Sequence, residues 1–495
     1  MKAGYIEKDK RKTILFLADD MRMPSGIGTM TRELILGTAH IFNYIHVGAG
    51  INHPDAGKVF DISPDINKES GITDASVLMY PYNGYGDQGL IRYLMNAHKI
   101  DAIVHFTDPR YWVWLYQMSA EIRQQIPIFY YHIWDDLPAP HYNKAFYESC
   151  DLLMGISKQS VNISHLVLGE GSYTELTDKT TAEEIAQSLP KTCYVPHGIN
   201  HNVFKKLESN PELELFKSRL FKGEDVEFSI LYNNRNIRRK MTSDIILAFK
   251  LFTSKLTPEQ VKKTRLVMHT QPMDENGTNL IAVIDTLCPE LVDNIIFTEA
   301  RYAPEDMCKL YNSCDVTINV GSNEGWGLSS TESMMCGTPI INNVTGGLQD
   351  QCRFEDENGE WIKFTPEFAT NHTGKYRKHG KWVKPVFPAA INLQGSIPTP
   401  YIFDDRADIR DIAKAMMAWY EIPVEERVEC GLAGREWAMS DEAGFTADNM
   451  CGNFAKACTT VLNNYVAPER FKVYNVQAEL DKYKNRKTGI VLSYE

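Results

Sequence analysis

Two series of short, mainly apolar runs, each alternating with helix-like segments, constrain the fold of this 495-residue chain most strongly. The first series comprises Thr13–Ala18, Ala102–Phe106, Ile128–His132 and Leu152–Ile156, with a helical pattern at Thr29–Gly37. The second comprises Phe228–Tyr232, Arg265–His269, Asn294–Thr298, Val316–Val320 and Pro339–Asn342. Such runs are typical of parallel strands covered by helices on both faces. The pattern therefore predicts two successive α/β lobes.

The length also favours two large domains over a single core. We predict an N-terminal Rossmann-like lobe over residues 1–205, a second such lobe over 206–440, and C-terminal helices over 441–495. A stretch from about residue 353 to 400, rich in Gly, Pro, Lys and aromatic residues, breaks the alternation and predicts an insertion of hairpins or loops. Helical patterns follow at Asp408–Tyr420 and Glu436–Tyr465. Ligands of such sheets bind at the carboxyl ends of strands, so the interlobe cleft is the expected site.

Composition narrows the class of protein. The first apolar run, Ile14–Ala18, is too short for a signal-peptide core or a membrane span. The ten cysteines show no C-x-x-C pair, which argues against a zinc site or a disulfide framework and favours a cytoplasmic protein. A net charge of −12 disfavours unaided binding to nucleic acid. The lysine-rich run Gly374–Lys384 could form a locally basic face, although a solvated loop is the simpler interpretation.

One stretch, SNEGWGLSSTESMMCGTPII at Ser322–Ile341, carries two acids around a glycine-rich turn. Glu324 lies in the loop that leaves the predicted strand Val316–Val320, where a ligand would bind. Gly325 and Gly327 would let the backbone approach a ligand, and the helix start behind them would offer free N–H groups to an anion. Ser329 and Glu332 have the S-x-x-E spacing of a capping box, so Glu332 also has an explanation without a ligand.

The same stretch resembles the E-x7-E signature of retaining, GT-B-fold glycosyltransferases, especially their large family 4. Four other segments extend the resemblance. Asn234–Lys240 is similar to the family's G-R-x-x-x-x-K, Val195–Phe204 to its interlobe segment, Tyr302–Val320 to the stretch that runs into the acidic motif, and Gly346-Gly347 to its later glycine pair. Asn234 replaces the glycine of that motif. The resemblance covers about residues 10–350 and the closing helices. It implies a GT-B fold, with two Rossmann-like lobes, a deep cleft, and a C-terminal helix that crosses back to the first lobe.

The family's roles can be transferred position by position. Glu324 would lie near the donor sugar, and Glu332 would accept hydrogen bonds from the ribose hydroxyls. Arg235 and Lys240 would stabilise negative charge on the leaving phosphate, the alternative being a solvated basic loop. The other expected donor-binding residues are Gly26 and Gly28 in the first lobe, where a simple tight turn is the alternative, and Gly325, Gly327, Leu328 and Ser329 in the second.

His132 ends a predicted strand at a place where the family often has a histidine beside the donor sugar. A lone histidine on a strand is more often a core residue, so both interpretations stay open. The pairs Asp19-Asp20, Asp135-Asp136 and Asp404-Asp405 read as helix caps or solvated acids rather than metal ligands. The resemblance accordingly implies no metal, and no cofactor besides the nucleotide-sugar substrate.

The resemblance implies a hexosyl- or pentosyltransferase that moves a sugar from a nucleoside-diphosphate donor to an acceptor hydroxyl with retention of configuration. Glu324 would then orient the sugar rather than act as a nucleophile, and Glu324→Ala should abolish turnover with little change in folding. The expected acceptor is a saccharide or glycolipid precursor. A phage-type enzyme that modifies a base in DNA is an alternative, with the 353–400 insertion as its basic arm. A nucleotide-sugar epimerase and a non-enzymatic scaffold are alternatives of other classes. The donor base, the sugar and the oligomeric state stay open.

Overall fold

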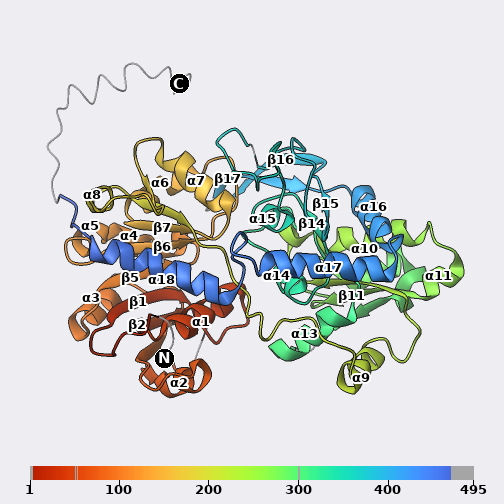
Figure 1. The fold of residues 1–495 in the computed structure, drawn as a ribbon, viewed down its shortest axis with the longest axis horizontal. Coiled ribbons are helices and arrows are strands. Elements are labelled where there is room, and N and C mark those ends of the chain that lie inside the picture. The colour runs from red at the N-terminus through yellow and green to blue at the C-terminus, as the bar shows by residue number, and fades with distance from the viewer. Residues whose placement is uncertain are drawn as a thin grey trace, which may run out of the picture.

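A computed structural model describes residues 4–469 except 51, 53, 299, 300, 369 and 398. Two lobes lie side by side, each a mainly parallel sheet covered by helices (Figure 1). The predicted α/β fold with two Rossmann-like lobes is confirmed. The last part of the predicted C-terminal region, residues 470–495, lies outside the described residues.

The first lobe is built on a nine-stranded sheet in which only β3 runs antiparallel to its neighbour. In spatial order its strands are β3 (Phe60–Asp61), β4 (Val77–Pro81), β2 (Phe42–Ala49), β1 (Lys12–Asp19), β5 (Ala102–Phe106), β6 (Ile128–His132), β7 (Leu152–Gly155), β9 (Lys191–Tyr194) and β8 (Thr174–Glu175). Its helices are α1 (Gly26–Thr38), α2 (Ser63–Ser70), α3 (Gln88–Ala97), α4 (Val113–Gln117), α5 (Ser119–Ile122), α6 (Lys144–Glu148), α7 (Lys158–Leu168) and α8 (Ala182–Ala186).

The second lobe contains a six-stranded parallel sheet and a separate hairpin. In spatial order the sheet comprises β12 (Ile295–Phe297), β11 (Thr264–His269), β10 (Phe228–Asn233), β13 (Val316–Asn319), β14 (Ile340–Asn343) and β15 (Val383–Val386). The hairpin pairs β16 (Ala390–Ser396) with β17 (Thr399–Arg406). The helices of this lobe are α9 (Pro211–Leu220), α10 (Thr242–Thr253), α11 (Pro258–Lys262), α12 (Leu280–Leu287), α13 (Pro304–Ser313), α14 (Leu328–Met335), α15 (Leu348–Cys352), α16 (Ile409–Tyr420) and α17 (Val424–Ala438). The last helix, α18 (Ala447–Asn463), lies on the first lobe.

Strand order places a ligand crevice in each lobe. β1 lies between β2 and β5, and β10 lies between β11 and β13, so the chain direction across the sheet reverses at β1 and at β10. Such a switch point leaves a crevice outside the carboxyl ends of the strands. In the second lobe the loop after β10 and the loop after β13 flank that crevice. These loops carry the basic motif and the acidic motif of the sequence.

The predicted insertion of hairpins or loops contains loops, the start of the β16–β17 hairpin and one further strand, β15. β15 extends the second sheet by pairing parallel to β14, which the Lys- and Pro-rich sequence did not predict. Pro385 is tolerated there because β15 is an edge strand, so one side of its backbone needs no partner. The lysine-rich run is also partly packed: Lys384 Nζ lies 4.8 Å from the centre of the Trp419 ring, and the Arg377 guanidinium lies 4.4 Å from that of Phe387.

The helical pattern at Glu436–Tyr465 is divided between two helices, since α17 ends at Ala438 and α18 begins at Ala447. The segment between them returns the chain to the first lobe, where α18 packs on α1 (Figure 1). It runs beside the outgoing linker: the Ile199 N–H donates to the Phe445 carbonyl at 2.9 Å. A β-carbon at Gly198 would overlap the Thr446 carbonyl, so glycine allows the two crossings to touch.

Candidate active site

Glu324 and Lys240 form a buried ion pair at the second lobe's crevice. Lys240 comes from the 3₁₀ turn Arg238–Lys240 after β10, and Glu324 from the loop after β13. The Lys240 ammonium donates to Glu324 Oε2, and each residue is only 7% exposed. Burial raises the pKa of Glu324, but Lys240 and Arg239 outweigh it and hold that pKa below its ordinary value. Glu324 is therefore an anion at neutral pH.

Arg239 joins this pair from the same turn. Its guanidinium donates to the Asn323 carbonyl at 2.7 Å and lies 3.9 Å from Glu324 Oε2. The sequence did not select Arg239, because the spacing of the family motif matches Arg235 and Lys240 and leaves Arg239 without a role. In the structure it is Arg239, with Lys240, that faces Glu324.

Arg235 lies apart from this pair. Its guanidinium binds Asp274, with Nε 2.6 Å from Oδ2 and Nη2 3.1 Å from Oδ1, and its side chain is 62% exposed. Asp274 is thus the ion-pair partner of Arg235, the residue to which the resemblance assigns binding of the donor phosphates. A phosphate could compete for this guanidinium because Arg235 is the exposed member of the pair, whereas the Asp274 side chain is only 7% exposed.

Glu332 lies beside a second hydrogen-bonded chain at the same edge of the sheet. The Tyr311 hydroxyl donates to Glu332 Oε2 at 2.6 Å, and the Asn233 side-chain amide donates to the Tyr311 oxygen at 2.7 Å. Burial raises the pKa of Glu332, which the Tyr311 hydroxyl partly offsets. The capping-box interpretation is wrong: Gly327 is the N-cap of α14, so Glu332 lies inside the helix and the Ser329 hydroxyl accepts a long 3.5 Å bond from Asn234 instead.

The glycines around the acidic motif serve close packing. Gly327 has a φ of 88°, a left-handed conformation that favours glycine, and begins α14 ahead of Leu328 and Ser329. A β-carbon at Gly325 would lie 3.2 Å from the Ile133 carbonyl of the first lobe. Gly325 therefore lets the acidic loop pack closely against the first lobe.

The first-lobe glycine loop faces the same helix. Ser25 caps α1 by accepting from the Gly28 N–H at 3.0 Å. A β-carbon at Gly26 would lie 3.3 Å from Leu328 Cδ1, so Gly26 of the first lobe lies close to the start of α14. Gly28 is required locally, because its β-carbon would lie 2.7 Å from the Met23 carbonyl.

His132 is enclosed in the first lobe. Its ring is fully buried, with Nε2 2.7 Å from the Tyr147 hydroxyl and Nδ1 3.2 Å from the Ser164 hydroxyl. Burial lowers its pKa to about 3, so the ring is neutral. Both nitrogens are occupied by core hydroxyls, and the structure does not bring His132 to the Glu324–Lys240 pair.

Asp135 and Asp136 are not the solvated acids that the sequence suggested. Both lie in the loop after β6 and are only partly exposed. Burial raises the pKa of Asp135 to about 6, with Arg239 opposing the rise and Glu324 adding to it. Burial also raises the pKa of Asp136, whose Oδ1 accepts from the Asn323 amide. The first lobe thus brings two carboxyl groups to the acidic loop of the second.

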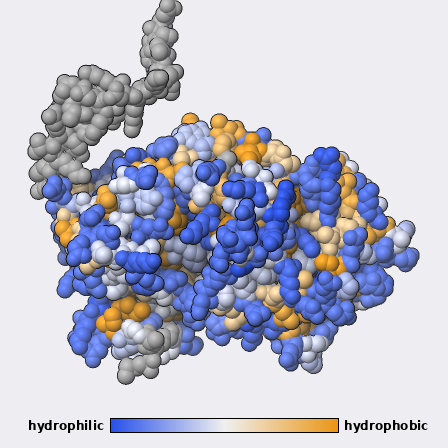
Figure 2. All heavy atoms as spheres, turned by 45° about the horizontal axis from the view of Figure 1, so that its top comes forward, coloured by the Kyte–Doolittle hydropathy of each residue, from blue (hydrophilic) through white to orange (hydrophobic). Residues whose placement is uncertain are grey.

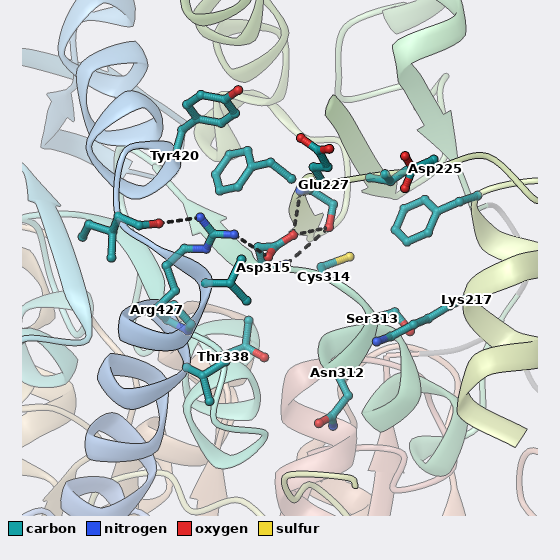
Figure 3. Close-up of a pocket in the computed structure, with 18 of the residues that line it drawn as sticks. Lys217, Asp225, Glu227, Asn312, Ser313, Cys314, Asp315, Thr338, Tyr420 and Arg427 are labelled. Atoms are coloured by element: carbon teal, nitrogen blue, oxygen red, sulfur yellow. Dashed lines mark hydrogen bonds and ion pairs between the residues drawn. The ribbon is translucent and has the colours of Figure 1, made fainter. Parts of the chain in front are cut away.

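A separate cavity of about 930 Å³ lies at the opposite edge of the second sheet, near the amino ends of β10, β13 and β14 (Figure 3). Its wall includes the ion pair between Arg427 and Asp315, at 3.1 Å, with Lys217 pointing in from the other side. Because ligands of parallel sheets bind at carboxyl ends, the Glu324–Lys240 pair, and not this cavity, is the candidate active site.

Comparison with known proteins finds sequence similarity in the second lobe. Residues 216–369 match the family model for "Glycosyl transferases group 1", so most of the second lobe is similar to that group. The chain is 33% identical over 95 residues to a D-inositol 3-phosphate glycosyltransferase of Stackebrandtia nassauensis, covering 19% of this chain and 21% of the relative. It is 23% identical over 198 residues to one of Thermobispora bispora, covering 38% and 45%. The chain thus matches less than half the length of these relatives.

The fold has clear counterparts among solved structures. The structure of Anabaena HepE in complex with UDP and glucose superposes with a TM-score of 0.61 at 14% identity, covering 91% of this chain and 100% of that one. Sucrose-phosphate synthase of Thermosynechococcus elongatus gives 0.61 at 15% identity, covering 92% and 100%. The predicted GT-B fold is confirmed.

Two further features bear on the class of protein. No helix in the described part of the chain is long and apolar enough to span a membrane. Among the same residues, no group of three or more His, Cys, Asp or Glu side chains is arranged to hold a metal ion.

Proposed function

We propose that this chain transfers a sugar from a nucleoside-diphosphate donor to an acceptor hydroxyl with retention of configuration. The observation that carries the proposal is the buried Glu324–Lys240 pair at the β10–β13 switch point. A carboxylate held ionised beside a lysine can hydrogen-bond a sugar and stabilise positive charge at its anomeric carbon. The first donor to test is a UDP-hexose, because the similar HepE structure contains UDP and glucose.

Each of the residues at this site would have a separate role in the transfer. Lys240 and Arg239 would balance charge that builds on the leaving diphosphate, and Arg235 would join them by leaving Asp274. Glu332 would accept hydrogen bonds from the ribose hydroxyls in place of that from Tyr311. The bond from the acceptor oxygen to the anomeric carbon forms as the anomeric carbon–phosphate oxygen bond breaks. The acceptor's proton passes to the leaving phosphate on the same face.

The proposed acceptor is a saccharide or glycolipid hydroxyl. Of the seven Lys and Arg residues at 353–400, Lys375, Arg377 and Lys384 lie on aromatic rings, so part of the suggested nucleic-acid arm is engaged in packing. The face that carries the β16–β17 hairpin is mainly hydrophilic, with hydrophobic residues in scattered patches (Figure 2). Neither feature favours a DNA acceptor over a sugar.

The test is to incubate the protein with UDP-, GDP- and ADP-sugars and a panel of sugar acceptors, while following release of nucleoside diphosphate. A transferase releases diphosphate in proportion to a new glycoside, whose anomeric configuration NMR determines. An epimerase would convert the nucleotide sugar without releasing diphosphate. Absence of any conversion across the panel would favour the scaffold alternative.

A further inference from the structure

The loop after β6 runs against the acidic loop of the second lobe over several residues. The Asn323 side-chain amide donates to Asp136 Oδ1, and a β-carbon at Gly325 would lie 3.2 Å from the Ile133 carbonyl. The Trp134 indole N–H donates to the Asp136 carbonyl at 2.9 Å, which stiffens the loop. Asp135 therefore lies between two residues that already touch the second lobe.

Asp135 itself lies next to Glu324. A β-carbon at Gly346 would lie 3.6 Å from Asp135 Cβ, and the same β-carbon would overlap the Glu324 carbonyl. Only a glycine thus separates the two acids. Glu324 is bonded by Lys240, whereas in the described part of the chain the Asp135 carboxyl accepts no side-chain hydrogen bond.

The charged groups that face Asp135 come from both lobes. Asp136 is its neighbour on the loop, and Glu324, Arg239 and Lys240 face it from the second lobe. Packing does not account for an acid here, because burial disfavours its ionised form and a neutral side chain would avoid that cost. Groups kept at such a cost are concentrated at functional sites.

We propose that Asp135 is a substrate-contacting residue whose carboxylate accepts a hydrogen bond from a hydroxyl of the acceptor sugar and orients it beside Glu324. This inference rests on the proposed function. Asp135 belongs to the first lobe, opposite the expected donor-binding residues, and an anion there suits a hydroxyl but repels the donor's phosphates. The carboxylate holds the acceptor hydroxyl in place, and the proton still leaves with the phosphate.

The decisive variant is Asp135→Asn, which keeps the size of the side chain and removes its charge. We expect kcat/KM for the acceptor to fall about 100-fold, the cost of a misplaced reactant, while the nucleoside-diphosphate Kd stays within about twofold. The wild-type pH profile should rise through about pH 6 as the carboxylate forms, because burial raises the Asp135 pKa to about 6. The variant should lack this rise. Exposed Asp65→Asn, on α2, is the matched control and should behave as wild type.

A merely structural role would weaken nucleotide binding as well and would leave the pH profile unchanged. An Asp135→Asn enzyme with normal acceptor kcat/KM, or with the rise near pH 6 intact, overturns the inference. If that variant fails to fold, Asp135→Ser provides the same comparison, and a nucleotide-induced thermal shift verifies its folding. A wild-type protein inactive with every donor would refute the proposed function. An active wild type with an equally active Asp135→Asn would refute only the role of Asp135.

Discussion

Replacing Glu324 by Gln should destabilise the second lobe as well as abolish transfer. The change leaves the Lys240 ammonium, which is 7% exposed, without its bonded partner. Removing one member of a buried pair costs about 3–5 kcal/mol. Because Asp135 also faces Lys240, we expect a value near the lower limit, about 3 kcal/mol.

For a domain the size of the second lobe, each kcal/mol lowers the Tm by about 2–4 °C, so Glu324→Gln should lower it by roughly 6–12 °C. Differential scanning calorimetry measures this shift. Lys240→Met should lower the Tm by a similar amount. The Tm of the double variant should fall by less than the sum of the two single effects, because the double variant leaves no unpaired buried charge. The fold holds the pKa of Glu324 below its ordinary value, so the pair's stabilisation is present above about pH 4.5 and is lost on further acidification.

An unchanged Tm in Glu324→Gln, or strictly additive effects in the double variant, would contradict a buried pair. The sequence alone predicted little change in folding on loss of Glu324, because it could not show that Glu324 is the buried ion-pair partner of Lys240. Inactivity without destabilisation would support the sequence-based expectation and not the structural one.

Three further outcomes are expected. Arg235→Ala should weaken nucleoside-diphosphate binding at least tenfold in calorimetric titration, yet change the ligand-free Tm little, because the Arg235 side chain is 62% exposed and Asp274 keeps the Asn276 N–H as a donor. Asp135→Asn should be more stable than wild type at pH 8 but not at pH 4. The raised pKa of Asp135 means that the folded state disfavours its ionised form. This costs the wild type on the order of 2 kcal/mol of stability, and the cost develops between about pH 4 and 6. Phe454→Ala should cost about 3–5 kcal/mol in calorimetry, because this fully buried ring joins α18 to Phe16 of the first lobe; a loss under 1 kcal/mol would contradict that packing.

The strands were predictable where both faces of the sheet are covered. β5 and β6 coincide with the predicted runs, because a strand buried on both faces needs apolar residues throughout. β15 was missed because an edge strand tolerates Pro385 and Lys384. The break between α17 and α18 was missed because apolar residues continue through it, among them Phe445, which packs against Trp326.

The site residues were predictable only where a single loop carries a recognisable sequence motif. Glu324 and Lys240 were selected separately from motifs 84 residues apart, and the switch point at β10 brings them together. Partners supplied by other elements left no local signal: Tyr311 for Glu332, Asp274 for Arg235, and Tyr147 and Ser164 for His132. In the sequence, Asp135 and Asp136 resemble a solvated acidic pair. Only the contact between the lobes places Asp135 in a partly buried environment.

The most direct test of the central claim, that the second lobe binds a nucleoside-diphosphate sugar, is a thermal-shift screen with UDP, GDP, ADP, CMP and dTDP. A ligand at about one hundred times its Kd adds roughly 2.7 kcal/mol of stability. The account predicts a clear rise in Tm with one diphosphate, and a loss of that rise in Arg235→Ala. No rise with any nucleotide, or a rise that persists in Arg235→Ala and Lys240→Met alike, would contradict it.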